Sequence, residues 1–199
     1  MGASVLHEDA MFPVHKVGIP TLIRNTNDPS HPGTVISLSA PYDANTPIIT
    51  GVAGHKGFSV ISVEKAMMNS ELGFGCRVLQ VLADCGISFE HMPSGIDNLS
   101  VVVSSDALAP HREEVVRRIA DLTAPDSLRI HDHVSLIATV GRGMVNNRGT
   151  AARLFSAMSR AGINIRMIDQ GSSELSIIVG VDEQDFESTI KAIYSEFVG

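Results

Sequence analysis

The feature that most constrains this chain is a stretch that occurs twice at a fixed offset. Residues 73–103 align without a gap to residues 149–179, because each position pairs with one 76 residues later, as in Gly162 − Gly86 = 76. The identical pairs include Arg77/Arg153, Gly86/Gly162, Ile87/Ile163, Gly95/Gly171, Leu99/Leu175 and Ser100/Ser176. Solenoid repeats have periods of roughly 20–50 residues. The longer period therefore indicates a duplicated small domain.

The first copy shows an alternation of expected strands and helices. Cys76, Leu79 and Leu82 follow helical spacing, and Gly86 suits the left-handed residue that ends such a helix. The expected strands are residues 58–64, 87–92, 99–103 and 128–130, and the expected helices are residues 76–85 and 110–122. This β-α-β-β-α-β order is that of ferredoxin-like folds.

The second copy repeats the order but ends without a fourth strand. Its expected strands are residues 134–140, 163–168 and 175–181, and its expected helices are residues 150–161 and 185–197. An apolar segment upstream, Ile48–Ala53, reads as a strand that Gly54–Gly57 ends. We expect this early strand to complete the late copy. The predicted fold class is α+β, with two ferredoxin-like domains, the first inserted within the second.

The first forty residues differ from the repeat. They contain two expected strands, residues 19–24 and 35–38, and a helix up to Lys16 that is broken near Pro13. These elements are too few to bury their own apolar faces, so they are interpreted as the tail of a larger domain. The predicted domains are residues 1–40, residues 57–132, and residues 46–56 with 133–199, joined by a linker.

Composition excludes several classes of partner. The net charge is −7, without a basic run, which argues against nucleic acid and anionic membranes. The sequence has neither an apolar run of about 18 residues nor a secretory signal. Cys76 and Cys85 lie on one expected helix, about 13.5 Å apart along its axis, which is too far for a disulfide. We interpret them as small buried thiols of a cytoplasmic protein.

The usual cofactor motifs are incomplete. Gly141–Asn146 begins like a dinucleotide-binding fingerprint, but its sixth residue is Asn. No phosphate-binding loop with Gly-Lys-Ser/Thr is present. His131 and His133 share one face of an expected strand, without a visible third metal ligand. Neither a cofactor, a metal nor a catalytic residue is therefore predicted for this chain.

A glycine-containing polar loop leads into the first helix of each copy, at residues 69–75 and 146–149. A helix N-terminus attracts a carboxylate through its N–H groups and partial positive charge. We expect the second strand to begin beside this end, where Glu90 could accept from an ammonium group. A free amino acid fits this combination. The alternative is that the glycines serve only as turns and caps.

The sequence resembles the aspartate kinase family over essentially its whole length. Gly2–His7 and Ile19–Ser37 resemble the end of the catalytic domain, and Ile49–Val63 resembles the entry to the regulatory region. Two further segments resemble the two ACT domains of these enzymes, VLADCGISFEHMPSGIDNLSVVV and LFSAMSRAGINIRMIDQGSSELSIIVGV. The resemblance implies the βαββαβ fold and an insertion of one ACT domain within the other.

The resemblance also implies a function. Aspartate kinases phosphorylate the β-carboxylate of aspartate with ATP and magnesium, and end-product amino acids inhibit them at the ACT domains. The family's glycine-rich, lysine-bearing motif and most of the kinase core are missing from this sequence. We therefore expect a regulatory fragment or subunit without kinase activity, which a separate catalytic subunit could partner.

The segment FEHMPSGID resembles that of lysine-inhibited members, which implies L-lysine as effector, with L-threonine as a further candidate. Carried over from the family, the implied effector-binding residues are Met68, Asn69, Ser70, Glu71, Gly73, Phe74, Ser88, Phe89, Glu90, Asn164, Ile165, Ser173 and Glu174. Many ACT loops carry Pro-Gly before the helix, where this chain has Leu72-Gly73. ACT sheets commonly pair at their edges across subunits, so the resemblance implies a homodimer. Exposed edge strands favour the same outcome, because they can pair with another chain. A dimerisation module that binds no effector is the alternative.

Overall fold

The computed structural model describes residues 8–38, 47–145 and 147–198. The chain divides into two compact units, Met1–Thr46 and Pro47–Gly199. The predictions made above for residues 1–7 and 39–46, and for Asn146, concern residues outside the described ranges.

The first unit contains one helix and one hairpin, α1 (Glu8–Lys16), β1 (Thr21–Ile23) and β2 (Thr34–Ile36). The strands pair antiparallel, with Thr21 opposite Ile36. Both strands were predicted, although they are shorter than expected. The predicted break at Pro13 is wrong, because α1 continues through this residue.

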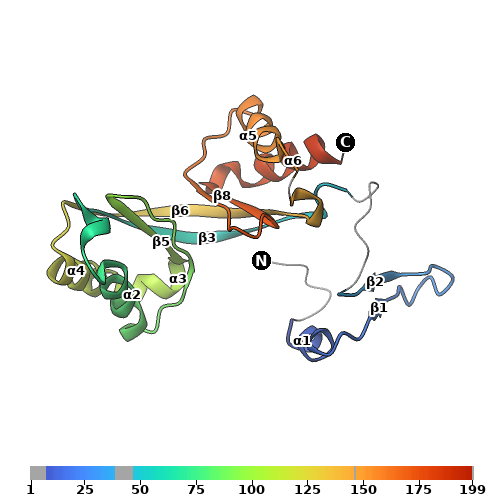
Figure 1. Cartoon of the computed structure of the whole chain (residues 1–199), viewed down its shortest axis with the longest axis horizontal. Helices are drawn as coiled ribbons and strands as arrows, with labels where there is room; N and C mark the ends of the chain where they lie inside the picture. The colour runs from blue at the N-terminus through green and yellow to red at the C-terminus, as the bar shows by residue number, and fades with distance from the viewer. Residues whose placement is uncertain (1–7, 39–46, 146, 199) are drawn as a thin grey trace. The chain divides into compact units, whose positions relative to one another are not determined.

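The second unit carries the two copies (Figure 1). The elements of the first copy are β3 (Gly51–Glu64), η1 (Met68–Ser70), α2 (Phe74–Asp84), β4 (Phe89–His91), β5 (Asn98–Ser104), α3 (Ser105–Leu108), η2 (Ala109–His111), α4 (Arg112–Thr123) and β6 (Ser127–Val140). Those that follow are η3 (Arg142–Met144), α5 (Thr150–Arg160), β7 (Met167–Asp169), β8 (Ser176–Asp182), η4 (Glu183–Asp185) and α6 (Phe186–Phe197).

Two 14-residue strands, β3 and β6, run through both copies. Residues 48–53 and 58–64 were predicted as separate strands, and so were residues 128–130 and 134–140. These predictions are wrong, because β3 and β6 each continue through the expected break as a single strand with an irregularity. The register shifts at two places, between His55 and Phe58 and between Phe58 and Val60. A β-bulge absorbs an irregular residue without ending the strand.

Each of the two long strands has a residue with positive φ at this irregularity, and the two residues occupy equivalent positions of the repeat. Gly57 has φ 88° and His133 has φ 57°, and their numbers differ by 133 − 57 = 76. Both residues adopt the left-handed conformation, which is unfavourable for a residue that has a Cβ atom. The second copy thus keeps the backbone geometry of the first, although His replaces Gly.

The strands form one antiparallel six-stranded sheet in the order β4-β5-β3-β6-β8-β7. In its second half, the beginning of β3 pairs with the end of β6, with Gly51 opposite Val140 and His55 opposite Leu136. The early strand therefore completes the late copy, as the sequence predicted. The predicted α+β class, with one ferredoxin-like copy inserted within the other, is confirmed.

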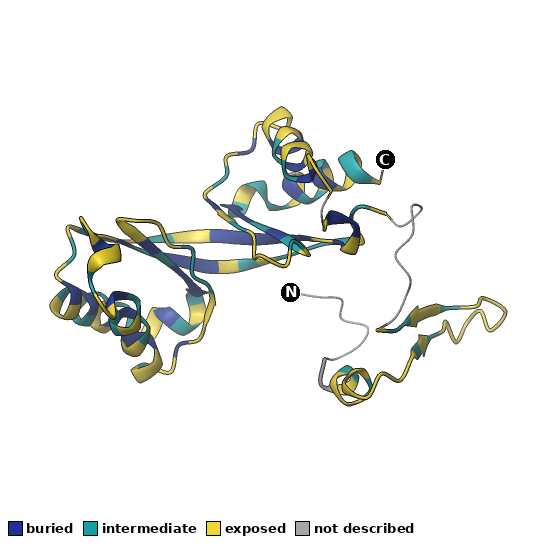
Figure 2. Cartoon of the chain, viewed as in Figure 1, coloured by how far each residue is buried: buried dark blue, intermediate teal, exposed yellow. Residues whose placement is uncertain are grey.

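The helices cover opposite sides of the long strands. In Figure 1, α2 and α4 lie on one side and α5 and α6 on the other. Each helix pair encloses a separate core, visible as buried residues in Figure 2. The first core includes Ile61, Val78 and Val101, and the second includes Ile137, Leu154 and Ile177, all fully buried.

The first helix of each copy ends in the same way. Gly86 and Gly162 have φ 69° and 72°, as predicted for Gly86. The N–H of Ile87 donates to the carbonyl of Leu82 at 2.9 Å, and the N–H of Ile163 donates to that of Met158 at 3.1 Å. These are the bonds of a Schellman turn, which fixes where the following segment begins.

A third cluster of buried hydrophobic residues lies at the junction of the two copies. It is formed by Phe58, Val60, Val102, Val134, Leu136 and Met167. Phe58 and Val134 are 134 − 58 = 76 residues apart, as are Val60 and Leu136. Across the same junction, Nδ1 of His91 lies 2.9 Å from a carboxylate oxygen of Asp169. Equivalent residues thus pack together, so the two copies share a common interior.

Replacing Thr139 by Val is expected to stabilise the fold. Thr139 is fully buried, and its hydroxyl has no hydrogen-bond partner among the described residues. Its counterpart in the first copy is Val63 (139 − 63 = 76), which is also fully buried. Removing an unpaired buried hydroxyl should raise the free energy of unfolding by about 1 kcal/mol, measured by urea denaturation.

The matched control for this substitution is Thr123→Val. Thr123 is equally buried, but its hydroxyl donates to the carbonyl of Ile119 at 2.7 Å. We expect this variant to be neutral or to lose up to about 1 kcal/mol. A loss of stability in Thr139→Val would contradict the assignment of an unpaired hydroxyl.

The bulge gives a second prediction on stability. His133→Gly should raise the free energy of unfolding by up to about 1 kcal/mol, because it relieves a left-handed non-glycine residue. Gly57→Ala should lower it by about 1 kcal/mol, although a Cβ atom there meets nothing within 4 Å. Thermal and urea unfolding of both variants would measure these changes. If the two substitutions changed the free energy of unfolding in the same direction, the two positions would not be equivalent.

Candidate functional site

The first copy contains a pocket of about 330 Å³ at the beginning of α2. It is lined by Met68, Asn69, Glu71, Gly73, Phe74, Gly75, Met92, Ser94, Gly95 and Leu99. Five of these ten residues were predicted, namely Met68, Asn69, Glu71, Gly73 and Phe74. Ser70, also predicted, is not among them, and its hydroxyl donates to the carbonyl of Met67 at 2.8 Å.

Hydrogen bonds connect the two segments that form the walls of this pocket, the loop before α2 and the turn before β5. The N–H of Lys65 donates to the carbonyl of Asp97 at 2.9 Å, and the N–H of Asn69 donates to that of Ile96 at 3.1 Å. The N–H of Met67 donates to the carboxylate of Asp97 at 2.8 Å. The loop before α2 is therefore fixed to the turn before β5, which preorganises the pocket.

A cluster of three charges borders the pocket. Glu71 accepts from Lys65 at 2.6 Å and forms a second ion pair with Arg77. The hydrogen bond from Lys65, with further help from Arg77, lowers the pKa of Glu71. Both cations also lie 5.7 Å from the ring centre of Phe74, which is buried. Together the three charged side chains carry a net charge of +1.

The backbone adds to this positive character. Gly73 precedes α2 with φ 74°, and Phe74 and Gly75 form the first turn of the helix. First-turn N–H groups have no acceptor within the helix and carry partial positive charge. Gly75 leaves open space, since a Cβ atom there would meet nothing within 4 Å. The arrangement suits a small anionic group such as a carboxylate.

The residues expected from the second strand lie elsewhere. Ser88 and Phe89 line a different pocket, of about 500 Å³, at the C-terminal end of α2 with Leu79, Leu82 and Gly86. Glu90 is exposed on β4, at the edge of the sheet. The expectation that this strand begins beside the helix N-terminus is wrong, because a segment that directly follows a helix starts at its C-terminal end.

The predicted residues of the second copy do not line the first-copy pocket. Asn164 and Ser173 are exposed, and Ile165 packs against the core of the second copy. Glu174 has φ 56°, and its N–H donates to the carbonyl of Gly171 at 3.1 Å. These four residues therefore belong to the turns that flank β7.

Sequence reasoning missed the far wall of the pocket, formed by Met92, Ser94, Gly95 and Leu99. A signal was present, since Gly95 and Leu99 recur as Gly171 and Leu175 in the repeat. Met92 and Leu99 were assigned to expected strands, and residues 93–98 only to the turn between them. Two of its hydrogen bonds with the loop before α2 join backbone groups only, and residue types do not reveal such bonds.

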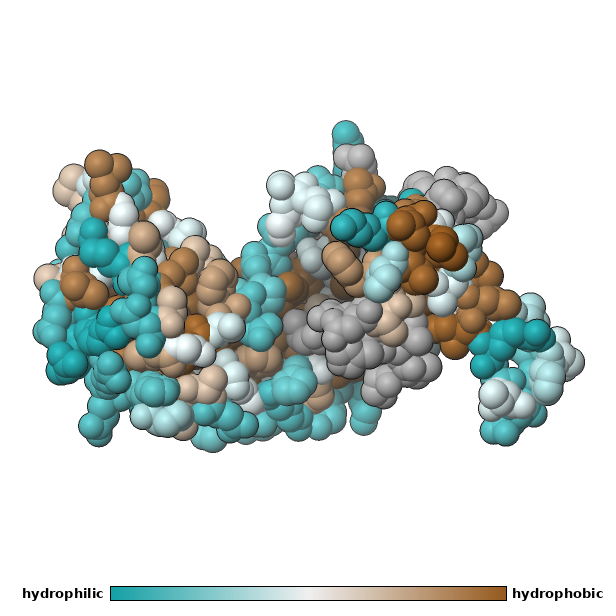
Figure 3. Space-filling view, turned by 90° about the horizontal axis from the view of Figure 1, so that it is seen from below, coloured by the Kyte–Doolittle hydropathy of each residue, from teal (hydrophilic) through white to brown (hydrophobic). Residues whose placement is uncertain are grey.

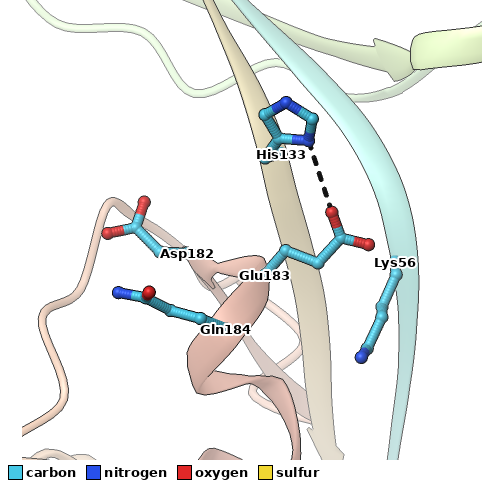
Figure 4. A pocket seen from close by; sticks show the side chains of 5 residues that line it. All are labelled: Lys56, His133, Asp182, Glu183 and Gln184. Atoms are coloured by element: carbon cyan, nitrogen blue, oxygen red, sulfur yellow. Dashed lines mark ion pairs between the residues drawn. The ribbon is translucent and has the colours of Figure 1, made fainter.

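A second, more open pocket of about 530 Å³ lies in the second copy, lined by Lys56, His133, Asp182, Glu183 and Gln184 (Figure 4). Its charges are paired within the protein. Nδ1 of His133 lies 3.5 Å from Glu183, and Lys56 pairs with Glu187 at 2.7 Å. Asp182 pairs with Arg166 at 3.2 Å. This pocket offers no comparable place for an anion.

Apolar side chains surround the first-copy pocket. Met67, Leu72 and Ile96 are 70%, 94% and 68% exposed, on the loops that form its walls. Hydrophobic side chains also lie among hydrophilic ones in the part of the second unit that contains α2 and α4 (Figure 3). Cys76 is exposed on α2 as well, so its prediction as a buried thiol is wrong.

The glycines that begin like a dinucleotide fingerprint serve packing. A Cβ atom at Gly141 would lie 2.3 Å from the carbonyl oxygen of Ile48, and one at Gly143 would lie 2.5 Å from that of Pro47. The segment leading into β3 therefore passes against both glycines. Among the described helices, none is long and apolar enough to cross a membrane.

Known proteins resemble this chain in sequence and in structure. A family model for the ACT domain matches residues 137–197. Aspartokinase 3 of Bacillus subtilis is 41% identical over 197 residues, which make up 98% of this chain and 43% of that protein. Clostridium acetobutylicum aspartate kinase superposes with a TM-score of 0.89 and 49% identity, over 97% of this chain and 45% of that chain.

A third relative shares the fold at lower identity. E. coli aspartokinase III, in complex with lysine and aspartate, superposes with a TM-score of 0.73 and 21% identity, over 98% of this chain and 42% of that chain. The chain spans less than half the length of all three relatives. By these similarities it belongs to the aspartokinase family, and its second unit has the ACT fold of the regulatory part of these enzymes.

Proposed function

We propose that this chain senses an amino acid for the feedback inhibition of an aspartokinase, with L-lysine as effector and L-threonine as the next candidate. The parent enzyme would phosphorylate L-aspartate with ATP and magnesium to 4-phospho-L-aspartate in the cytoplasm. Its catalytic part would be a longer form of this chain or a separate catalytic subunit. Inhibition follows if the effector binds one arrangement of the regulatory part more tightly than another.

The observation that carries the proposal is the first-copy pocket at the N-terminus of α2. The two cations at its border, Lys65 and Arg77, share the carboxylate of Glu71, and the first turn of the helix adds partial positive charge. The carboxylate of an amino acid fits this end. E. coli aspartokinase III in complex with lysine shares the fold, which supports lysine as the ligand to test first.

The ammonium groups of lysine need acceptors outside this pocket. Ser88, Phe89 and Glu90 are exposed at an edge of the sheet, and edge strands are available for pairing with another chain. In a homodimer formed through the first copies, the Glu90 carboxylate of one chain would approach the pocket of the other. The site would then be complete only between two chains.

The alternative is a dimerisation module that binds no effector. The exposed apolar side chains of Met67, Leu72 and Ile96 favour it, because exposed apolar clusters commonly mark interfaces. This module would dimerise equally well with and without amino acids. Ligand-dependent stability therefore separates the two functions.

L-Lysine should raise the unfolding temperature of the chain, and Gly75→Leu should remove that shift. A ligand at 100 times its Kd stabilises by about 2.7 kcal/mol, which is roughly 5–11 °C for a chain of this size. The introduced leucine side chain would enter the open space beside Gly75 and block the pocket, while it favours the helix. Differential scanning fluorimetry with lysine, threonine and methionine measures the effect.

Gln80→Leu is the control for Gly75→Leu, because Gln80 is exposed on the same helix outside the pocket. It should keep the full lysine shift. A wild-type chain that no pathway amino acid stabilises would support the dimerisation module. A lysine shift that persists in Gly75→Leu would place the ligand elsewhere.

Glu90→Ala tests whether a second chain completes the site. The lysine shift should fall by at least half in this variant, since the ammonium group loses its acceptor. Stability without ligand should stay unchanged, because the Glu90 side chain is exposed. Glu113→Ala, another exposed acid, is the control. Sedimentation velocity would show whether dimers form, and an unaffected lysine shift would contradict the role of Glu90.

A further inference from the structure

Three potential metal ligands of different chemistry converge at the end of α2 that is remote from the pocket. They are Cys85, His111 and Glu114, whose ligand atoms all lie within 4.8 Å of one another. Cys85 is the C-terminal cap of α2, and His111 directly precedes α4. Both are half-buried, and the cysteine is free.

The donor set matches a borderline-soft divalent cation. Thiolate, imidazole and carboxylate together are typical ligands of Zn²⁺. His111 and Glu114 are three residues apart, and Nδ1 of His111 lies 3.9 Å from Oε2 of Glu114. His111 is the N-cap of α4 and Glu114 lies in the first turn of that helix. Small side-chain rotations would bring all three donors to coordination distance.

Neighbouring charges hold the carboxylate in a suitable orientation. Nη1 of Arg118 lies 3.6 Å from Oε1 of Glu114, which is the oxygen that does not face His111. Arg118 also pairs with Asp84, so its own charge is balanced. Outer partners of this kind commonly orient metal ligands. Oε2 of Glu114 remains on the side of His111.

The duplication shows that the fold itself does not require this cluster. At the structurally equivalent positions, which are the C-cap of the first helix and the start of the second, the second copy has Ala161 for Cys85, Asp185 for His111 and Ser188 for Glu114. The second copy forms its helix layer without these three donors. The cluster is therefore an addition specific to the first copy.

We propose that Cys85, His111 and Glu114 bind a Zn²⁺ ion, with water as the fourth ligand. The ion would connect the C-terminal end of α2 to the N-terminal end of α4. Bound Zn²⁺ requires the thiolate form of cysteine, so metal binding would also shield Cys85 from thiol reagents. This proposal is independent of the effector.

Titration of the reduced 199-residue chain with Co²⁺ tests the site. Co²⁺ takes the place of Zn²⁺ and gives a sulfur-to-metal charge-transfer absorption only when a thiolate ligates it. The wild-type chain should show this band, and one equivalent of Zn²⁺ should abolish it by displacement. Cys85→Ser should lose the band, whereas Cys76→Ser should keep it.

His111→Gln supplies an independent readout that does not depend on the thiolate band. Its Zn²⁺ affinity, measured by competition with a chromophoric chelator, should fall at least tenfold, while His133→Gln should match the wild type. Circular dichroism would verify that each variant is folded. Absence of the band in the wild type, or its persistence in Cys85→Ser, would overturn the proposal.

Discussion

The pairing of β3 with β6 is the constraint on which the second unit depends. The two strands run antiparallel from Gly51 opposite Val140 to Glu64 opposite Ser127. Each half of this ribbon receives two further strands and two helices of its own copy. The second copy takes its half of β3 from the segment that precedes the first copy, so it cannot complete its sheet from a contiguous stretch of chain. The shared cluster around Phe58 and Val134 buries the junction from water, which reinforces this dependence.

The two copies have kept their backbone geometry but not their charges. Asp132, on β6, forms a double ion pair with Arg112 at the start of α4, at 2.9 Å. The position equivalent to Asp132 is Lys56 (132 − 56 = 76), which pairs with Glu187 of α6. The strand-to-helix ion pair is thus conserved with its signs exchanged. Each helix is therefore complementary in charge to the strand of its own copy. If the helices of the two copies were exchanged, Arg112 would lie beside Lys56 and Glu187 beside Asp132, and both pairs would repel.

The repeat in the sequence predicted the features that depend on local sequence or on the duplication. It did not predict the features that depend on contacts between distant segments. The copies, the helix ends at Gly86 and Gly162, and the borrowed strand all follow from the register and from turn chemistry. The continuity of β3 does not, because Gly54–Gly57 reads as a stop, and only pairing with β6 keeps it extended. In the site, the loop before α2 was predictable from its glycines and polar residues. Met92 and Ser94 were not, since backbone hydrogen bonds bring their turn to the pocket.

The position of α2 separates the two groups that the proposed amino-acid site would need. Its N-terminus and the cations Lys65 and Arg77 attract a carboxylate, and Glu71 is already engaged by both cations. The acid suited to an ammonium group, Glu90, follows the C-terminal end of the same helix. An 11-residue helix separates its two ends by about 16 Å, more than a small amino acid spans. In the proposed amino-acid site, the acceptor for the ammonium group would therefore come from a second chain, and the exposed edge strand β4 is where that chain could supply it.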